Sequence, residues 1–196
     1  MNEEHMKICS SPEWAEYVEN ELLPWALSTH NLGDDVLEVG PGPGRTTDVL
    51  RQRVARLTAV EIDPQLAAAL AARLADTNVE VVCADATALP FEDERFSSAV
   101  MFTMLHHVPS TELQNRLFAD VRRALRPGAL FAGSDSTETT ARWLLHESDI
   151  YVPVDPSSLA SRLDAAGFVD IVVEQATDRF RFLARRPQCA SRESPY

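Results

Sequence analysis

The sequence predicts one α/β domain, spanning residues 1–186, in which a parallel sheet is covered by helices on both faces. Strand-like apolar runs alternate with helix-like segments between residues 36 and 133, and this alternation requires crossover helices between parallel strands. A glycine-rich loop follows the first of these runs, and the run at 96–102 is expected to be buried on both faces. A chain of 196 residues suits one domain with a sizeable core.

The N-terminal part, residues 1–32, is expected to be helical, chiefly over residues 13–28. Apolar residues recur there at spacings of three and four and form one stripe, namely Trp14, Val18, Leu22 and Trp25. Pro24 lies inside the pattern and is expected to kink or divide the helix. Two interpretations remain open: a helix packed on the sheet edge, or a flap over a ligand site.

The stretch at 36–47 contains the strongest functional signal. An apolar strand, 36–39, leads into a loop with glycines at Gly40, Gly42 and Gly44, and a helix is expected from Arg45. Glycine has no Cβ, so the backbone can adopt positive φ and a ligand can approach closely. A strand that ends in such a loop and opens a helix is typical of nucleotide sites in open α/β sheets. An ordinary glycine turn is the alternative.

The spacing of this loop argues against a dinucleotide. The dinucleotide pattern is G-x-G-x-x-G, whereas this loop reads G-P-G-P-G, with Arg45 where the third glycine would fall. Glu38 lies just before the turn, where its carboxylate would repel a pyrophosphate and attract an ammonium group. The residues therefore favour a nucleoside that carries an amino acid.

Three more strands are predicted, each followed by a helix start or a polar loop. A strand at 57–62 ends beside Glu61, which can accept both hydroxyls of a ribose, and Asp63-Pro64 begins a helix that runs to about residue 74. A strand at 79–83 includes Cys83 as a small core residue. Asp85 follows that strand and can accept a hydrogen bond from an exocyclic amine. The strand at 96–102 opens into the loop 103–108.

The C-terminal half completes the pattern. Ser110 or Thr111 is expected to cap a helix, with Thr111 and Gln114 forming a capping box, and Pro127-Gly128 to end it before a strand at 129–133. The irregular segment 134–154, with Trp143, His146 and Tyr151, is either an acceptor-facing insertion or a crossover helix with loops. A helix from Asp155-Pro156 to Gly167 and strands at 169–174 and 180–184 follow, and a polar tail, 187–196, is expected to be disordered.

Composition narrows the functional classes. With 45% hydrophobic and 24% charged residues, no membrane-spanning run and no signal peptide, a soluble protein of the reducing cytoplasm is expected. Cys9, Cys83 and Cys189 are too few and too scattered for a disulfide framework or a zinc cluster, so no metal site is predicted. The net charge of −12 argues against nucleic acid as a partner. The only basic cluster is expected to be a solvated face, and comprises Arg179, Arg181, Arg185 and Arg186.

Taken together, LEVGPGPG, VEID, CADATALPF, SSAVMFTMLHHV and LRPGALFAGSD resemble, in order and spacing, the motifs of class I S-adenosylmethionine-dependent methyltransferases of the type 11 branch. The resemblance implies a Rossmann-like three-layer sandwich whose seven-stranded sheet is mostly parallel, with one antiparallel strand. It implies S-adenosyl-L-methionine as the cofactor, with the glycine loop on its methionine part, Glu61 on its ribose and Asp85 on its adenine. The residues that it assigns to the cofactor are Glu38, Gly40, Pro41, Gly42, Gly44, Thr46, Glu61, Ile62, Asp85, Ala86 and Thr103.

The chemistry implied is in-line displacement at a sulfonium methyl. Orientation of the two partners can supply roughly 7–11 kcal/mol in favourable cases. An acceptor with a high pKa would also need a general base, and His106 and His107 are the titratable pair in the right loop. Either could instead line the cofactor or cap the next helix.

Several alternatives remain open for the function. The same motifs also resemble ribosomal RNA adenine dimethyltransferases, but those enzymes need an Asn/Asp-Pro-Pro/Leu-aromatic element where this chain has Thr103-Met104-Leu105-His106. That departure, with the charge, favours a small-molecule acceptor. A non-catalytic S-adenosylmethionine-binding module that acts through a partner is the main alternative. The acceptor and the oligomeric state are left open.

Overall fold

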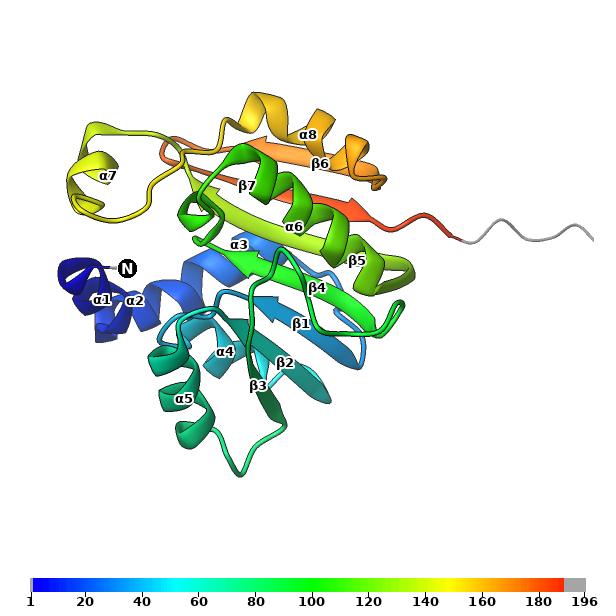
Figure 1. The fold of residues 1–196 in the computed structure, drawn as a ribbon, viewed down its shortest axis with the longest axis horizontal. Coiled ribbons are helices and arrows are strands. Elements are labelled where there is room, and N and C mark those ends of the chain that lie inside the picture. The colour runs from blue at the N-terminus through cyan, green and yellow to red at the C-terminus, as the bar shows by residue number, and fades with distance from the viewer. Residues whose placement is uncertain (1, 189–196) are drawn as a thin grey trace, which may run out of the picture.

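The computed structural model describes residues 2–188, which form a seven-stranded sheet in the order β3-β2-β1-β4-β5-β7-β6 (Figure 1). The strands are β1 Asp35–Val39, β2 Arg56–Glu61, β3 Val79–Cys83, β4 Phe96–Phe102, β5 Leu125–Ser136, β6 Val169–Gln175 and β7 Arg179–Arg185. Neighbouring strands from β3 to β5 are parallel, whereas β7 runs antiparallel to both β5 and β6. The predicted mostly parallel sheet with one antiparallel strand is confirmed.

Helices cover both faces of this sheet. Those of the N-terminal half are α1 Glu3–Ser10, α2 Pro12–Tyr17, the π-helical segment η1 Val18–Leu22, α3 Leu23–Leu27, α4 Arg45–Leu50 and α5 Pro64–Arg73. Those of the C-terminal half are the 3₁₀ turn η2 Leu105–His107, α6 Thr111–Ala124, α7 Thr140–Leu145 and α8 Pro156–Ala165. One core packs η1 and α3 on Val36, Val100 and Leu130, and the other packs α6 and α8 on the opposite face. The result is the predicted three-layer sandwich.

Pro24 divides the N-terminal helix as predicted. Proline has no N–H to donate and its ring clashes with the carbonyl four residues earlier. The turn before it is accordingly widened: the Leu23 N–H donates to the Val18 carbonyl, five residues back, and α3 begins with Pro24 in its first turn. The helix α1 lies in the expected helical region but before the stretch 13–28 where the helix was mainly expected. It is capped by Asn2, whose side-chain oxygen accepts the His5 N–H at 2.9 Å.

Three details of the predicted elements are wrong. Cys83 is exposed, because β3 is an edge strand. Gln114 forms no capping box, because its amide donates to the carbonyls of Leu105 and Val152. The fifth strand begins at Leu125, before Pro127-Gly128, so the helix ends at Ala124.

The basic cluster also differs from the predicted solvated face. Arg179 stacks on Trp25 and donates to Tyr17, and Arg186 donates to the carbonyl groups at the end of α6. These two guanidinium groups therefore link the C-terminal strand β7 and the residue after it to the N-terminal helices and to the end of α6.

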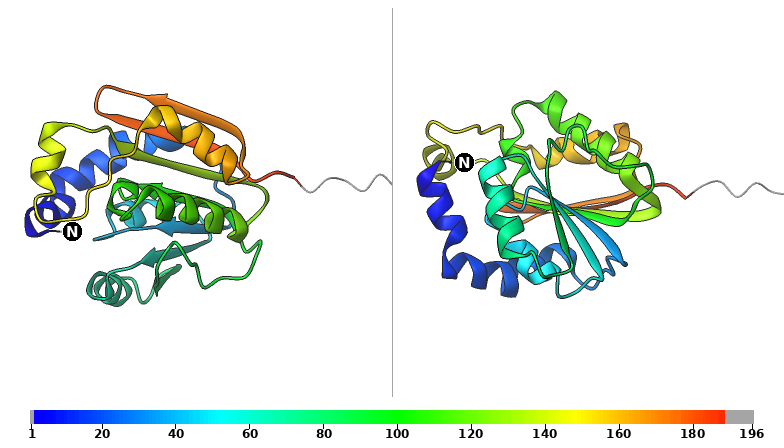
Figure 2. Two further views of the ribbon diagram at one scale, coloured as in Figure 1. Left: turned by 45° about the horizontal axis from the view of Figure 1, so that its top comes forward. Right: turned by 60° about the horizontal axis from the view of Figure 1, so that its bottom comes forward.

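The loops at the carboxyl ends of β1, β2, β3 and β4 lie at one edge of the sheet, as parallel strands require. The N-terminal helix α1 lies beside α7 at this same edge (Figure 2), and the Asn2 amide donates to the Leu145 carbonyl at 2.7 Å. Within residues 2–188, no helix has the length and apolarity needed to cross a membrane. Residues 189–196 of the predicted disordered tail lie outside the described residues, as does Cys189.

Candidate functional site

A cavity of about 430 Å³ lies at the carboxyl ends of β1 to β4. Its volume is within the range of about 300–1,000 Å³ that is usual for small-molecule sites. The predicted cofactor residues on its wall are Gly40, Pro41, Gly42, Thr46, Glu61, Ile62, Asp85, Ala86 and Thr103. Glu38 and Gly44 were also predicted, but neither is part of the wall.

The glycine loop has the backbone that its composition predicts. Gly42 has φ +54° and Gly44, at the start of α4, has φ +86°, in the left-handed region that side chains disfavour. A Cβ on Gly44 would lie 2.4 Å from Cδ1 of Leu70, so a larger residue would add a side-chain clash to the strain of its positive φ. Gly42 turns its N–H toward Glu61. Gly44 therefore shapes the loop, whereas Gly42 belongs to the cavity wall.

Glu38 lies beneath the loop and is 1% exposed. It accepts a hydrogen bond from the Thr46 hydroxyl, which ties β1 to the first turn of α4. Burial raises the pKa of Glu38 to about 7, although the hydrogen bond from Thr46 opposes the rise. A buried acid with this pKa is half ionised near neutrality and responds to any cation that arrives nearby.

Glu61 joins two of the loops that form the wall. Its Oε2 accepts the Gly42 N–H at 3.0 Å, and its Oε1 accepts the Asp63 N–H at 3.0 Å. The side chain is 6% exposed and is therefore held in one place at the end of β2. A carboxylate offers about four lone-pair positions, so Glu61 can still accept hydrogen bonds from a ligand.

Asp85 stands on the same wall, after β3. Its side chain is exposed, and Oδ1 accepts the Thr87 N–H at 2.8 Å, while the next residue, Ala86, is buried. The strand tips thus bring Glu61 and Asp85 into one cavity, as their positions predicted.

Thr103, at the tip of β4, has a strained backbone. Its φ is +50°, which is a rare value for a β-branched residue, and its N–H donates to the Ser134 carbonyl at 2.8 Å. Such strain persists only where the surroundings impose it, and it is concentrated at functional sites. Its position on the cavity wall supports a functional reason for this strain.

The two histidines predicted as bases occupy different environments. His106 is 3% exposed, its Nδ1 lies 2.6 Å from Oδ1 of Asp135, and its ring is not on the cavity wall. His107 lines the cavity and its Nδ1–H donates to the Ile150 carbonyl at 3.2 Å. Burial, together with His106 and His5, lowers the pKa of His107 to about 3, so its ring is neutral near pH 7.

Asp135 is the buried partner of His106, at 2% exposure. It also accepts the backbone N–H groups of His106 at 3.1 Å and Ser136 at 2.7 Å. Burial alone would raise the pKa of Asp135, but the His106 ring and these backbone donors outweigh it, and the pKa lies below its usual range. The pair anchors η2 to β5.

Several residues of the cavity wall were not predicted from the sequence, because they belong to segments that contain no motif. The helices α1 and α2 contribute His5, Cys9 and Trp14, and the segment after α7 contributes Asp149 and Ile150. Residues 1–32 therefore form part of the wall; whether they move as a flap stays a prediction. Two signals pointed to this side: the apolar stripe that includes Trp14, and the segment 134–154, of which Asp149 and Ile150 are part.

Comparisons with known proteins find sequence similarity to methyltransferases. A family model described as a methyltransferase domain matches residues 37–133. The chain is 36% identical over 133 residues to sterol methyltransferase-like 3 of Botryococcus braunii, covering 62% of this chain and 32% of that protein. It is 33% identical over 150 residues to ribosomal RNA small subunit methyltransferase A of Leptothrix cholodnii, covering 68% and 55%. The chain thus spans about a third to about half the length of these relatives.

Solved structures share the fold at low identity. Phosphoethanolamine N-methyltransferase 2 of Haemonchus contortus, in complex with phosphomonomethylethanolamine and S-adenosylhomocysteine, superposes with a TM-score of 0.73 at 16% identity, covering 85% of this chain and 52% of that one. A putative methyltransferase of Haloferax volcanii, in complex with the Trm112 methyltransferase activator, superposes with a TM-score of 0.71 at 16% identity, covering 95% of each chain.

Proposed function

The chain belongs to the class I methyltransferase family, and from this premise we propose that it transfers a methyl group from S-adenosyl-L-methionine to a small-molecule acceptor. One observation carries the proposal: the glycine loop, Glu61 and Asp85 converge on one cavity of about 430 Å³. Bound there, the cofactor supplies an activated methyl group on a sulfonium. The protein's part is to hold and orient the two partners.

Different residues of the cavity wall are assigned to different parts of the cofactor. The Gly40–Gly44 loop and Thr46 take the methionine part, and Glu61 accepts the ribose hydroxyls. Asp85 accepts the adenine amine beside Ile62 and Ala86, and Thr103 lies where the methyl would be presented. Glu38 acts from beneath the loop, by its charge and through Thr46. His107 is the candidate base, because its ring reaches the cavity, whereas His106 positions η2 through Asp135.

The wall beyond Thr103 favours a small and largely apolar acceptor. It contains Met104, Val108, Leu113 and Leu117, with the imidazole of His107 as a polar group. A net charge of −12 and guanidinium groups engaged in internal contacts offer little to an RNA backbone. The likeness to a ribosomal RNA methyltransferase keeps RNA as the second acceptor class to test.

Calorimetric titration with S-adenosylmethionine tests the cofactor assignment. We expect the wild type to bind and Asp85→Ala to bind more weakly, while Asp76→Ala, an exposed aspartate in the turn before β3 at the other end of the sheet, binds like the wild type. Absence of heat with the wild type would refute the proposal.

Methyl transfer from labelled cofactor, with metabolite extract and RNA as separate acceptor pools, then identifies the acceptor class. Label in the metabolite pool supports the proposal. Label in RNA would overturn the small-molecule acceptor, and label in neither pool would favour a binding module.

Cofactor binding is also expected to release part of a proton from Glu38 near pH 7. In the free protein its pKa is raised to about 7 by burial, so about half of the molecules carry this proton at pH 7. A sulfonium and an ammonium near the carboxyl group favour its ionised form, so the proton leaves and binding tightens as the pH rises through 7. Calorimetry in buffers of different ionisation enthalpy measures the release.

Glu38→Gln is the control for this proton release, because it keeps the shape of the side chain and cannot ionise. The cofactor's own amino group also titrates near pH 8 and contributes equally in both proteins. Proton release that is the same in the wild type and Glu38→Gln would contradict the assignment to Glu38.

A further inference from the structure

Four of the chain's five histidines lie together at one end of the cavity. The ring centroids of His5 and His146 are 4.7 Å apart, those of His107 and His146 are 5.1 Å apart, and those of His5 and His107 are 5.1 Å apart. They come from three separate parts of the sequence: α1, the 3₁₀ turn η2 and the residue after α7. No sequence motif links these residues, so only the fold brings them together.

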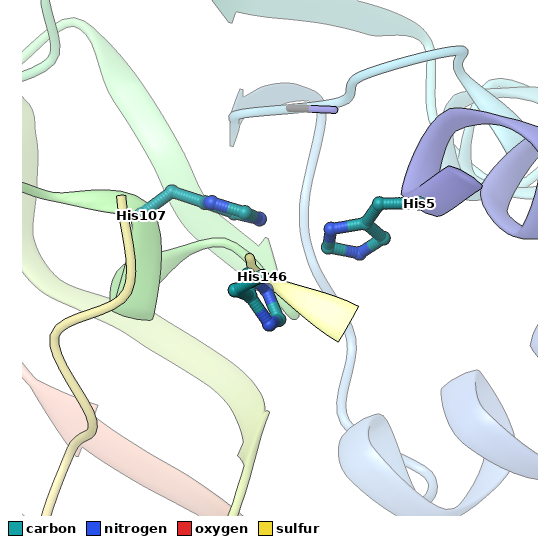
Figure 3. Close-up of side chains that lie close together, drawn as sticks. All are labelled: His5, His107 and His146. Atoms are coloured by element: carbon teal, nitrogen blue, oxygen red, sulfur yellow. The ribbon is translucent and has the colours of Figure 1, made fainter. Parts of the chain in front are cut away.

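We propose that His5, His107 and His146 bind one divalent transition-metal ion, of which Zn²⁺ fits best, at the acceptor end of the cavity. Each offers a ring nitrogen, and the three nitrogen atoms all lie within 4.8 Å of one another. Figure 3 shows the three rings turned toward one common space. Zn–N bonds are about 2.0–2.1 Å, which places the nitrogen atoms about 3.4 Å apart in a tetrahedron, so modest side-chain rotations complete the site.

The hydrogen bonds of two rings prepare them for this role. Nδ1 of His146 lies 2.6 Å from the Arg142 carbonyl, and Nδ1 of His107 lies 3.2 Å from the Ile150 carbonyl. A carbonyl can only accept, so both rings carry their proton on Nδ1 and keep the lone pair on Nε2. Donation of the second ring N–H to a carbonyl is the usual outer contact of a metal-bound histidine.

A second observation in support of the metal site is that two of the ring nitrogen atoms are buried without a hydrogen-bond partner. Within the described part of the chain, Nδ1 of His5 and Nε2 of His146 are buried without a hydrogen-bond partner, although the residues are only 6% and 3% exposed. Such atoms destabilise the fold unless something pairs with them. A cation that shares the space of these rings pairs with all three at once.

The surroundings favour a cation that prefers nitrogen. Asp149 also lines the cavity, and its negative charge acts on all three rings. Mg²⁺ and Ca²⁺ prefer oxygen ligands, whereas three imidazoles suit Zn²⁺ and its neighbours in the transition series.

Three protein ligands leave a fourth position, as in catalytic zinc sites. His5 and His107 belong to the cavity wall, so this position faces the cavity. This part of the inference rests on the proposed function: an oxygen, nitrogen or sulfur atom of the acceptor would bind there. The cation would lower the pKa of that atom beside the methyl donor. In the metal-loaded protein the ion would therefore replace His107 as the group that activates the acceptor, because Nε2 of His107 then binds the ion.

Calorimetric titration of metal-free, tag-free full-length protein with Zn²⁺ tests the site without any cofactor or acceptor. We expect one ion per chain, and no binding of Mg²⁺. His5→Phe and His146→Phe keep a ring in the packed cluster and remove a ligand nitrogen. Each should weaken Zn²⁺ binding by more than about 100-fold, since even outer contacts account for about 10–100-fold.

His30→Phe is the matched control, because His30 is the one histidine outside the cluster and its Nδ1 contacts the Leu27 carbonyl. It should bind Zn²⁺ like the wild type, and thermal denaturation without metal should show that every variant is folded. No binding by the wild type, or equal binding by His5→Phe, would overturn the site whatever the outcome of the S-adenosylmethionine titration. The Co²⁺-loaded protein tests the fourth position: its visible spectrum should change on addition of azide, and an unchanged spectrum would refute an open position.

Discussion

Replacing Glu61 by alanine is expected to raise the dissociation constant for S-adenosylmethionine by about 100-fold or more. In the proposed complex its carboxylate accepts both ribose hydroxyls, and hydrogen bonds to charged groups contribute about 1.5–3 kcal/mol each. The same substitution removes the acceptor for the Gly42 and Asp63 N–H groups, so the glycine loop loses its anchor to β2. Calorimetric titration of the variant measures the change directly.

Two further variants separate the roles of charge and position. Glu61→Gln keeps the shape and one acceptor oxygen, so its loss of affinity should be smaller than that of Glu61→Ala. Glu80→Ala removes a glutamate from the neighbouring strand β3, where the side chain pairs with Arg95 away from the cavity, and should leave affinity unchanged. Wild-type affinity in Glu61→Ala would show that the ribose lies elsewhere.

The fold was largely predictable because its signals are local. The alternation of strands with helices, the helix starts at Asp63-Pro64 and Asp155-Pro156, and the glycine loop each depend on a few neighbouring residues. The errors arose where tertiary contacts decide the outcome. Cys83 has the neighbours of a buried residue, yet its strand lies at the sheet edge. The end of α6 is capped by Arg186, which lies far along the chain.

The candidate site was predictable only in part for the same reason. Glu61 and Asp85 follow predicted parallel strands, and the ends of such strands meet at one edge of the sheet. Glu38 was assigned to the same set; it is 1% exposed, accepts the Thr46 hydroxyl and is not on the cavity wall, so its role stays a prediction. His5 and His146 belong to helices outside the motifs, and their meeting with His107 follows from the docking of α1 beside α7.

Replacing Asp135 by alanine is expected to lower the free energy of unfolding by about 3–5 kcal/mol, because a buried donor that loses its acceptor costs about 1–3 kcal/mol and Asp135 serves three donors. The substitution leaves the ring of His106 and two backbone N–H groups buried without an acceptor. It also releases η2 from β5, so Thr103 and His107 at the cavity wall lose their support. Urea denaturation, read by circular dichroism, measures the change.

Two further variants test whether the stabilisation comes from the hydrogen bonds that Asp135 accepts. Asp135→Asn keeps the volume and one acceptor oxygen, so it should cost less than alanine, although its amide cannot serve all three donors. Asp164→Ala, at an exposed position of α8, should stay within about 0.5 kcal/mol of the wild type. A loss below about 1 kcal/mol in Asp135→Ala would mean that solvent or a rearranged η2 satisfies these donors, and that the His106–Asp135 pair does not hold this side of the cavity.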